Sequence, residues 1–541
     1  MEKFSQKICG VISIPLENSS KVIRRFGRLC RLNKIGENLH NPRFFYPMNL
    51  SRSSGILLHP TSLPNRYGIG DFGKSAYDFV DFLHDSGCQL WQTLPLGPTG
   101  FGDSPYQSFS TFAGNPYLIS PDLLLEDDLL HPNDLMEDLD FNDDFVDYGR
   151  IIGWKLNLLE RAFIRFTRDP KLARRDFNIF CEKNSDWLED YALFMALKEA
   201  NGGGSWSAWD ADLRNREKSA LANAKKELQV GIERFSFYQY LFFRQWDSLR
   251  AYAKKKKIQM IGDIPIFVSY DSADLWANPE LFFLDEKKLP TVVAGVPPDY
   301  FSKTGQLWGN PLYDWKQHKK TDYAWWIKRL RAILKMVDIV RLDHFRGFAG
   351  YWEVPAKNLT AEHGRWMPGP GAELFNALRV ALGDLPIIAE DLGEITPDVF
   401  ELRDQFNLPG MKILQFGFSD ESNPFLPHHY PENCVAYTGT HDNDTARGWY
   451  DSASEQERDF ARRYLSVDGS DIAWDLIRAL WHSHAALVLA PMQDLLSLGN
   501  EARMNYPGHA AGNWSWRMRG EMLGEELMAK LRALNENSGR L

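Results

Sequence analysis

Cysteine is scarce in this sequence, and long hydrophobic runs are missing. Only five of the 541 residues are cysteine, and they lie far apart with no CxxC pair: Cys9, Cys30, Cys88, Cys181 and Cys434. This usage argues against a disulfide framework and against a zinc site, and it indicates a reducing compartment. Residues 485–492 form one of the longest apolar runs, and it is far shorter than the roughly 20 residues that span a bilayer. We therefore expect no membrane insertion.

An excess of positive charge is missing as well. The net charge is -10 and the isoelectric point is about 5.8, so the chain lacks the basic character of a nucleic-acid-binding protein. An acidic balance mainly favours solubility. With 541 residues and 44% hydrophobic content, the chain is long enough for a large core and for more than one domain.

The first 47 residues differ from the rest of the chain. Residues 1–52 carry ten Lys or Arg against three Glu, with scattered Ser and no long apolar segment. An organellar transit peptide has this composition, and it would direct the protein to a plastid. The alternatives, which we favour, are a disordered tail or a start assigned upstream of the true start at Met48. We expect a basic extension over residues 1–47, a globular part over 48–541 and a cytoplasmic location, with a plastid as the alternative.

After Met48, short apolar runs recur at eight places, and many end in charged or polar residues: 55–60, 88–96, 258–266, 338–345, 385–393, 411–418, 434–444 and 487–494. Helical patterns lie between several of them, as at residues 75–87 and 325–337. Strands that alternate with helices predict βαβ units and a parallel sheet. If eight such strands close, they form a (β/α)8 barrel of the TIM type, an α/β fold whose active site lies at the C-terminal ends of the strands.

Two intervals are too long for simple connections of such a barrel. Residues 97–257 are rich in helical patterns and predict a helical subdomain. Residues 267–325 contain GVPPDYFSKTGQLWGNPLYDW, which is dense in glycine, proline and aromatic residues. This composition is typical of a binding loop, and we expect the segment to lie over the barrel mouth.

The segment DIVRLDHFRGF, residues 338–348, places charges at the end of the fourth predicted strand. Residues two apart in a strand point to the same side, so Arg341 and Asp343 share one side, while Val340 and Leu342 share the other. The apolar side should pack on the surrounding helices, and the charged side should face the barrel mouth. A guanidinium beside a carboxylate lowers its pKa. We therefore expect Asp343 to be ionised, as a nucleophile must be.

Further carboxylates end other predicted strands, at Asp263, Glu390 and Asp442. Such a group has three interpretations. It can bind a divalent metal with help from His344 and His441. It can act on a glycoside, with one carboxylate attacking the sugar and another protonating the leaving oxygen. It can also be a set of buried ion pairs. The 18 Trp and 20 Tyr offer flat faces for sugar rings and favour the glycoside, with Tyr106, Tyr300, Trp308 and Trp514 as examples.

Motifs along most of the chain resemble those of one family. They are SGILLHPTSLP (54–64), GDSPYQS (102–108), AGNPYLI (113–119), GDIPIFV (262–268), GVPPDYFSKTGQLWGNPLY (295–313), VRLDHFRGF (340–348), AEDLG (389–393), GTHDNDT (439–445), RMNYPG (503–508) and GNWSWR (512–517). In this order, over nearly all of residues 52–519, the sequence resembles the 4-alpha-glucanotransferases. These are also called amylomaltases or disproportionating enzymes, and they are relatives of the alpha-amylases.

The resemblance implies a role for each carboxylate. Asp343 matches the nucleophile, Glu390 the general acid/base and Asp442 the residue that stabilises the transition state. Further positions match residues around the reacting sugar or on the flexible loop above it: Arg341, Asp263, His344, His441, Tyr106, Gln306, Trp308, Tyr300 and Asn513. No metal or organic cofactor is expected, because the carboxylates carry out the chemistry.

The implied reaction moves a segment of an α-1,4-glucan to the 4-hydroxyl of glucose or of another glucan. It passes through a covalent glucosyl-enzyme and retains the configuration of the sugar. The expected partners are therefore maltooligosaccharides, starch or glycogen chains, and glucose. Two alternatives remain: an alpha-amylase-type hydrolase, which shares the three carboxylates, and a non-catalytic glucan-binding protein. The oligomeric state is left open.

Overall fold

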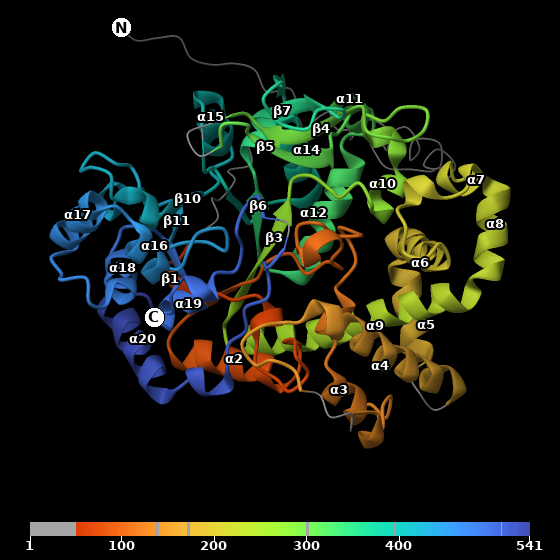
Figure 1. Cartoon of the computed structure of the whole chain (residues 1–541), viewed down its shortest axis with the longest axis horizontal. Helices are drawn as coiled ribbons and strands as arrows, with labels where there is room; N and C mark the ends of the chain where they lie inside the picture. The colour runs from red at the N-terminus through yellow and green to blue at the C-terminus, as the bar shows by residue number, and fades with distance from the viewer. Residues whose placement is uncertain (1–49, 136–139, 170–173, 299–301, 394, 510) are drawn as a thin grey trace, which may run out of the picture. The chain divides into compact units, whose positions relative to one another are not determined.

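Eight parallel strands close into a barrel in the computed structural model, which describes residues 50–135, 140–169, 174–298, 302–393, 395–509 and 511–541 (Figure 1). The strands are β1 (Ser53–Leu57), β2 (Leu90–Gln92), β3 (Gln259–Pro265), β6 (Ile339–Asp343), β9 (Ile387–Ala389), β10 (Gly410–Ile413), β11 (Cys434–Tyr437) and β12 (Leu487–Pro491). Their order around the barrel is β1-β12-β11-β10-β9-β6-β3-β2. Each overlaps one of the eight predicted runs, so the predicted (β/α)8 barrel is confirmed.

Side chains alternate between the inside of the barrel and the helices around it. Ile339 belongs to an interior cluster with residues from other strands, such as Leu90 and Ile261. Val340 and Leu342 belong to the outer core, as the period of two in a strand requires. Arg341 and Asp343 continue the side of Ile339 toward the C-terminal end of the barrel, which is the predicted arrangement.

Helices cover the outside of the barrel in the described part of the chain. They are α2 (Lys74–Asp85), α12 (Ala324–Met336), α14 (Gly371–Leu382), α15 (Pro397–Gln405), α16 (Ala446–Ser452), α17 (Glu455–Leu465), α18 (Ile472–Trp481), α19 (Met492–Leu495) and α20 (Glu525–Asn537). Helix α17 shows how the sequence sets a boundary. The Ser454 hydroxyl accepts from the Glu457 N–H, and the Glu457 side chain accepts from the Ser454 N–H, which together form a capping box.

The long interval between β2 and β3 is helical. It contains α3 (Pro121–Glu126), α4 (Tyr148–Arg168), α5 (Arg174–Lys183), α6 (Ser185–Ala200), α7 (Ala211–Arg214), α8 (Lys218–Glu227) and α9 (Gln229–Lys255). Most of these helices gather at the right of the view in Figure 1. Gly202 and Gly203 have φ values of 66° and 80° after α6, a conformation that glycine adopts without strain.

The interval after β3, which the sequence predicts to be a binding loop over the barrel mouth, also contains regular elements. They are β4 (Val292–Val296) and β5 (Gln306–Pro311), with α10 (Ala273–Ala277) before them and α11 (Trp315–Lys320) after them. These strands join β7 (Gly350–Pro355) and β8 (Arg365–Pro368), which follow α13 (Arg346–Ala349), in an antiparallel sheet of order β5-β4-β7-β8. The glycines and prolines of this segment obscure the strands, because sequence patterns do not show which backbone will pair.

The N-terminal extension, residues 1–47, lies outside the described residues. Its separation from the catalytic part stays a prediction. Within the described residues, no helix is both long enough and apolar enough to cross a bilayer.

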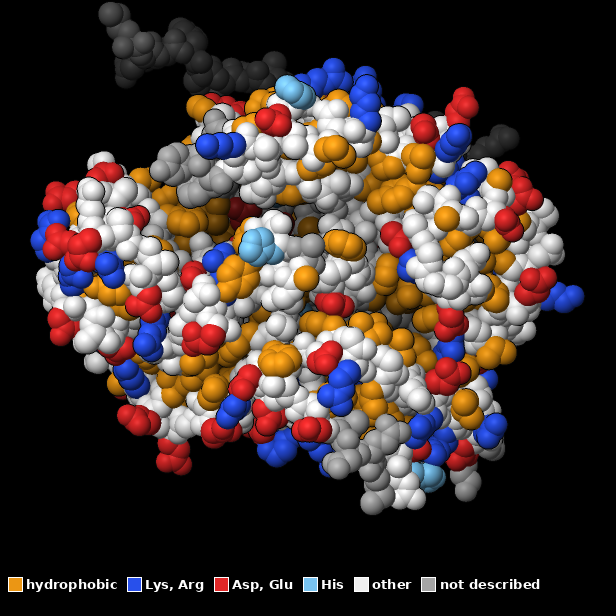
Figure 2. All heavy atoms as spheres, in the orientation of Figure 1, with side chains coloured by type: hydrophobic (Ala, Val, Ile, Leu, Met, Phe, Trp, Pro, Cys, Tyr) orange, Lys and Arg blue, Asp and Glu red, His pale blue; other side chains and the backbone are white. Residues whose placement is uncertain are grey.

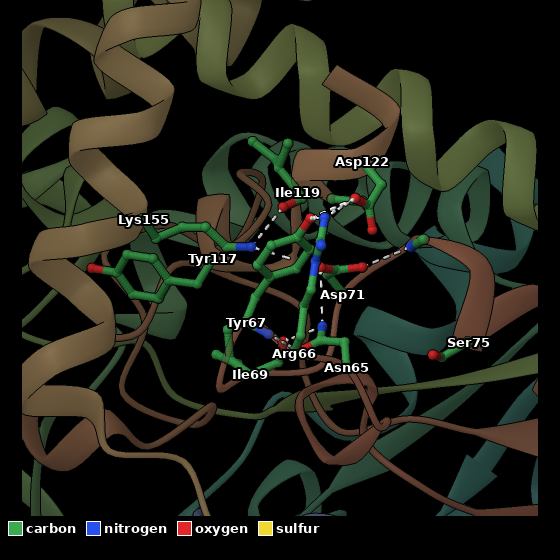
Figure 3. A network of polar contacts seen from close by, with 12 residues as sticks. Asn65, Arg66, Tyr67, Ile69, Asp71, Ser75, Tyr117, Ile119, Asp122 and Lys155 are labelled. Atoms are coloured by element: carbon green, nitrogen blue, oxygen red, sulfur yellow. Dashed lines mark hydrogen bonds and ion pairs between the residues drawn. The ribbon is translucent and has the colours of Figure 1, made fainter. Parts of the chain in front are cut away.

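A buried ion pair joins the helical insertion to the loop after β1 (Figure 3). The Lys155 ammonium on α4 donates to the Ile119 carbonyl over 2.8 Å and lies 3.8 Å from the Asp71 carboxylate. Asp71 also accepts from the Gly73 N–H and from the Asn65 amide. Burial lowers the pKa of Lys155 to about 8, while the charge of Asp71 opposes the shift. The Lys155 ammonium and the Asp71 carboxylate therefore each offset part of the cost of burying the other.

Removal of one member of this pair should destabilise the protein strongly. Lys155→Met leaves Asp71 buried without its cation, which costs about 3–5 kcal/mol. The double change Lys155→Met with Asp71→Asn should cost less than the single change, because no unpaired charge remains. Calorimetric Tm values would show this order. The exposed pair Lys74–Asp78 on α2, with an N–O distance of 2.6 Å, is the control, and its loss should barely alter Tm. A double variant less stable than Lys155→Met would contradict the prediction.

Candidate active site

A chain of polar contacts runs across the mouth of the barrel. Arg341 on β6 lies 2.6 Å from Asp263 on β3 and 3.0 Å from Asp343, the last residue of β6. The Tyr106 hydroxyl donates to the same oxygen of Asp263 over 2.8 Å. Asp263 and Arg341 are buried, whereas the Asp343 side chain keeps 27% exposure. Asp343 is therefore held from behind by a buried cation and remains open to the mouth.

Glu390 is held beside Asp343 by the backbone. It follows β9 directly, and its two carboxylate oxygens accept from the His344 N–H over 2.7 Å and from the Leu392 N–H over 2.9 Å. His344, the residue after Asp343, has a φ of 52°, which turns the chain sharply at the end of β6. This turn directs the His344 N–H at Glu390 and brings the two carboxylates to one site.

Asp442 lies in the loop after β11. His441 contacts one of its carboxylate oxygens at 3.3 Å, and the Asn505 amide donates to the other over 2.6 Å. The Arg503 guanidinium donates to the Asp442 carbonyl over 2.7 Å. The Asp442 side chain is 46% exposed, so it is fixed from one side and accessible from the other.

Aromatic rings line the same region. Tyr106 and His441 are stacked with centroids 5.1 Å apart, and Trp514 lies 5.8 Å from His441. On β5, Trp308 meets the His344 ring edge to face at 4.7 Å, and its indole N–H donates to the Gln306 side chain over 3.2 Å. The second sheet thus brings Trp308 and Gln306 to the catalytic strands. Figure 2 shows a recess in this face of the molecule, with acidic side chains at its base, where Figure 1 labels β6.

The electrostatics of Asp343 correct one prediction. The sequence suggests that Arg341 lowers the pKa of Asp343, but burial is the larger influence and raises it, while Arg341 only opposes the rise. Burial also raises the pKa of Glu390, and by more, against the opposing effects of Arg341 and the two backbone donors. Glu390 is therefore the weaker acid of the two, mainly because of desolvation, with repulsion by the Asp343 carboxylate as a smaller cause.

The pKa values of two neighbouring residues, Asp442 and His344, are lowered, in contrast to those of Asp343 and Glu390. Burial would raise the pKa of Asp442, but His441 and the Asn505 amide outweigh it and hold the pKa well below its usual range. Burial lowers the pKa of His344 to about 4, and Arg346 adds to this effect, so the imidazole is neutral. The site therefore combines two carboxyl groups whose pKa values are raised, Asp343 and Glu390, with one whose pKa is lowered, Asp442.

Two of the expected residues are not shown to contact this cluster. Tyr300 lies outside the described residues, and its role stays a prediction. The Asn513 amide is occupied within its own loop, since it accepts from the Tyr506 N–H and donates to the His509 carbonyl. Its contact with substrate stays a prediction.

Two other residues of the site were missed. Asn505 and Arg503 hold Asp442, yet the RMNYPG motif by itself indicates no role for either residue. The sole signal was the density of polar residues in that motif. Contacts over 61 and 63 positions cannot be read from local patterns.

The metal interpretation has no geometric support. Within the described residues, no three His, Cys, Asp or Glu side chains converge in a way that could hold a metal ion. Arg341 occupies the space between Asp263 and Asp343, and His441 is turned toward Asp442. A barrel mouth with paired carboxylates of unequal pKa and aromatic walls instead defines an enzyme that acts on glycosidic bonds.

Comparison with known proteins identifies the family. Residues 58–523 match the family described as 4-alpha-glucanotransferase. A 4-alpha-glucanotransferase of Synechocystis is 53% identical over 90% of this chain and 98% of its own, and that of Thermus thermophilus is 51% identical over 91% of this chain and all of its own. The structure of an amylomaltase from Streptococcus agalactiae, solved with acarbose, superposes with a TM-score of 0.88 at 43% identity, over 90% of this chain and 99% of the other. The chain belongs to the 4-alpha-glucanotransferase family, and it is an enzyme that transfers α-1,4-glucan segments.

Proposed function

We propose that Asp343 attacks the anomeric carbon of the glucan while Glu390 protonates the departing oxygen. The bond to the leaving sugar breaks and an ester to Asp343 forms. After the leaving glucan departs, Glu390 removes the proton from the 4-hydroxyl of the acceptor, which displaces Asp343 and restores the α configuration. Asp442 stabilises the positive charge of the transition state, because it is a carboxylate held ionised beside the reacting ring.

The observation that carries this assignment is the difference in pKa between two partly exposed carboxyl groups at one site. Glu390 has the more strongly raised pKa and is the acid, and Asp343 rests on Arg341 as the anion. Arg341 favours the ionised form of Asp343. It does so only in part, because the same guanidinium nitrogen also contacts Asp263. Tyr106 then holds the sugar at the rim of the site, while the buried Asp263 positions Tyr106 and the buried His441 positions Asp442.

Incubation with maltotriose tests the function. A 4-alpha-glucanotransferase converts it into a ladder of shorter and longer sugars with glucose as one product. A hydrolase yields glucose and maltose alone, and a non-catalytic binding protein yields no product. Glucose serves as the expected small acceptor. Of the three outcomes only the ladder agrees with the proposal. The Asp343→Asn variant is the negative control, and it should leave maltotriose intact.

The preference for transfer over hydrolysis should depend on Trp308. Its ring lies against His344 at the mouth, where an acceptor sugar would stack and exclude water. Trp308→Ala leaves the three carboxylates in place, so the intermediate still forms but water reaches it more often. The ratio of transfer to hydrolysis on maltotriose should fall about tenfold, which corresponds to the loss of one aromatic stacking contact, and total donor cleavage should fall less.

The adjacent residue provides the control for this prediction. Leu307 precedes Trp308 on β5 and is 37% exposed, and neighbouring strand residues point to opposite sides. Leu307→Ala should keep the ratio of glucose released to chains lengthened. An equal ratio in Trp308→Ala and wild type would assign Trp308 to packing or to donor binding.

The basic extension should be dispensable for catalysis. We propose that it is separate from the catalytic part, because its composition is that of a tail or an address and the family match begins at residue 58. A protein that begins at Met48 should fold and turn over maltotriose like the full chain. A markedly lower Tm would contradict this. The location follows from the mature N-terminus in the native cell, read by mass spectrometry: a processed start supports a plastid, and an intact one supports the cytoplasm.

A further inference from the structure

A buried arginine lies beside the C-terminal end of β3, outside the set of residues with a proposed chemical role. Arg329 is on α12, the helix that leads into β6, and its exposure is only 1%. Its guanidinium carbon lies 4.8 Å from the centre of the Trp326 ring. Burial of a guanidinium is costly, and burial lowers the pKa of Arg329. A side chain retained at such a cost needs a structural or functional reason.

The hydrogen bonds of Arg329 go to neutral oxygens on separate segments. Its Nε donates to the Thr111 hydroxyl over 2.7 Å, and its terminal nitrogens donate to the Pro265 carbonyl over 2.6 Å and to the Ile266 carbonyl over 2.9 Å. One of these nitrogens also lies 3.3 Å from the Tyr313 hydroxyl. The planar fork of arginine meets acceptors in several directions at once, whereas a lysine ammonium cannot match this geometry.

Each of these segments carries a residue of the active site. Pro265 and Ile266 end and follow β3, which carries Asp263, and Tyr313 follows β5, which carries Trp308. Thr111 belongs to the same connection after β2 as Tyr106, five positions away. Arg329 therefore fixes the relative positions of segments that must meet at the mouth.

Thr111 is the link between Arg329 and the reacting groups. Its N–H donates to the buried Asp274 carboxylate over 2.7 Å, so both its backbone and its hydroxyl are held. From this anchor the loop presents Tyr106, whose hydroxyl donates to Asp263 over 2.8 Å. Asp263 in turn contacts Arg341 at 2.6 Å. Arg341 also contacts Asp343 at 3.0 Å, so a continuous chain of contacts joins Arg329 to the proposed nucleophile.

We propose that Arg329 is a positioning residue for the transfer reaction, which acts through Thr111 to hold Tyr106 against Asp263. The inference rests on the proposed function. A free Thr111 hydroxyl would let the loop shift, and a displacement near 1 Å at a catalytic constellation lowers the rate by up to about 100-fold. Because Tyr106 acts on the reacting ring more than on distant sugars, kcat should fall while the KM for maltotriose changes little.

Two matched substitutions isolate the contact. Thr111→Val keeps the shape of the side chain and removes the hydroxyl, whereas Thr111→Ser keeps the hydroxyl that Arg329 needs. We expect kcat on maltotriose to fall about tenfold in Thr111→Val, a partial displacement, and to stay within about twofold of wild type in Thr111→Ser. Arg329→Lys should lower kcat at least as much as Thr111→Val.

A double-mutant cycle with Tyr106→Phe separates positioning from general stability. If Arg329 and Thr111 act through the Tyr106 hydroxyl, Thr111→Val should lower kcat less than about twofold in the Tyr106→Phe background, since coupled sites are not additive. Independent, multiplied effects would overturn the inference, and so would equal kcat values for Thr111→Val and Thr111→Ser. Absence of a sugar ladder from the wild-type protein would instead refute the proposed function. The Thr111 variants decide the outcome even if Arg329→Lys fails to fold.

Discussion

Asp343→Asn should lower kcat/KM for maltotriose disproportionation by about 10⁴-fold or more, as expected when the nucleophile of covalent catalysis is lost. The amide has the size of the carboxylate but cannot form the glucosyl ester. Arg341 keeps Asp263 as its partner at 2.6 Å, so the site should stay assembled and long maltodextrins should still bind. The measurements are steady-state kinetics on maltotriose and calorimetric binding of a maltodextrin.

The same substitution should not lower Tm at neutral pH. Because burial raises the pKa of Asp343 above its value in the unfolded chain, the ionised form destabilises the fold at neutral pH, and the neutral amide removes that cost. Asp338→Asn is the control. Asp338 precedes the same strand at the opposite end of the barrel, where it accepts from the Met260 N–H and contacts Arg250. It should lose stability and keep kcat. Substantial activity in Asp343→Asn would place the nucleophile elsewhere.

Glu390→Gln should slow the reaction of maltotriose strongly and that of a glucosyl fluoride only slightly. On maltotriose, loss of the general acid should lower kcat by about 10²–10⁴-fold. A glucosyl fluoride needs no proton on its leaving group, so formation of the intermediate from it should stay within about tenfold of wild type, a small part of that acid contribution. Rapid-quench measurement of fluoride release and maltotriose cleavage compares the two donors on one protein. If both donors fall equally, Glu390 is not the acid.

The pH dependence of kcat/KM is an independent test of the role of Glu390. In the proposed mechanism the active form has Asp343 ionised and Glu390 protonated, and burial raises both pKa values, that of Glu390 by more. On maltotriose, kcat/KM should rise as the pair loses its first proton and fall as it loses its second, with both limbs at higher pH than for exposed carboxylates. Glu390→Gln should lose the alkaline limb. Only one of the two backbone donors, the His344 N–H and the Leu392 N–H, then keeps an oxygen acceptor, which should cost about 1–3 kcal/mol of stability.

Local patterns were sufficient to predict the barrel and the carboxylates that gather at its mouth. The eight strands are encoded in runs of neighbouring apolar residues, and the period of two in a strand places Arg341 and Asp343 on one side. The C-terminal ends of parallel strands converge in any such barrel, so Glu390 after β9 and Asp442 after β11 could be assigned to one site in advance. The matching motifs added the identity of the reaction.

Only the tertiary structure decided which distant residues contact the site and how deeply each group is buried. Arg341 divides its contact between Asp343 on its own strand and Asp263, which lies 78 positions away. Asn505 holds Asp442 across 63 positions, and Arg329 reaches Thr111 across 218. The rise in the pKa of Asp343, against the sequence-based expectation, comes from burial, and the strands of the second sheet come from pairing between distant backbones. Composition and spacing describe neighbours along the chain, whereas burial and pairing depend on neighbours in space, and only the folded chain brings those together.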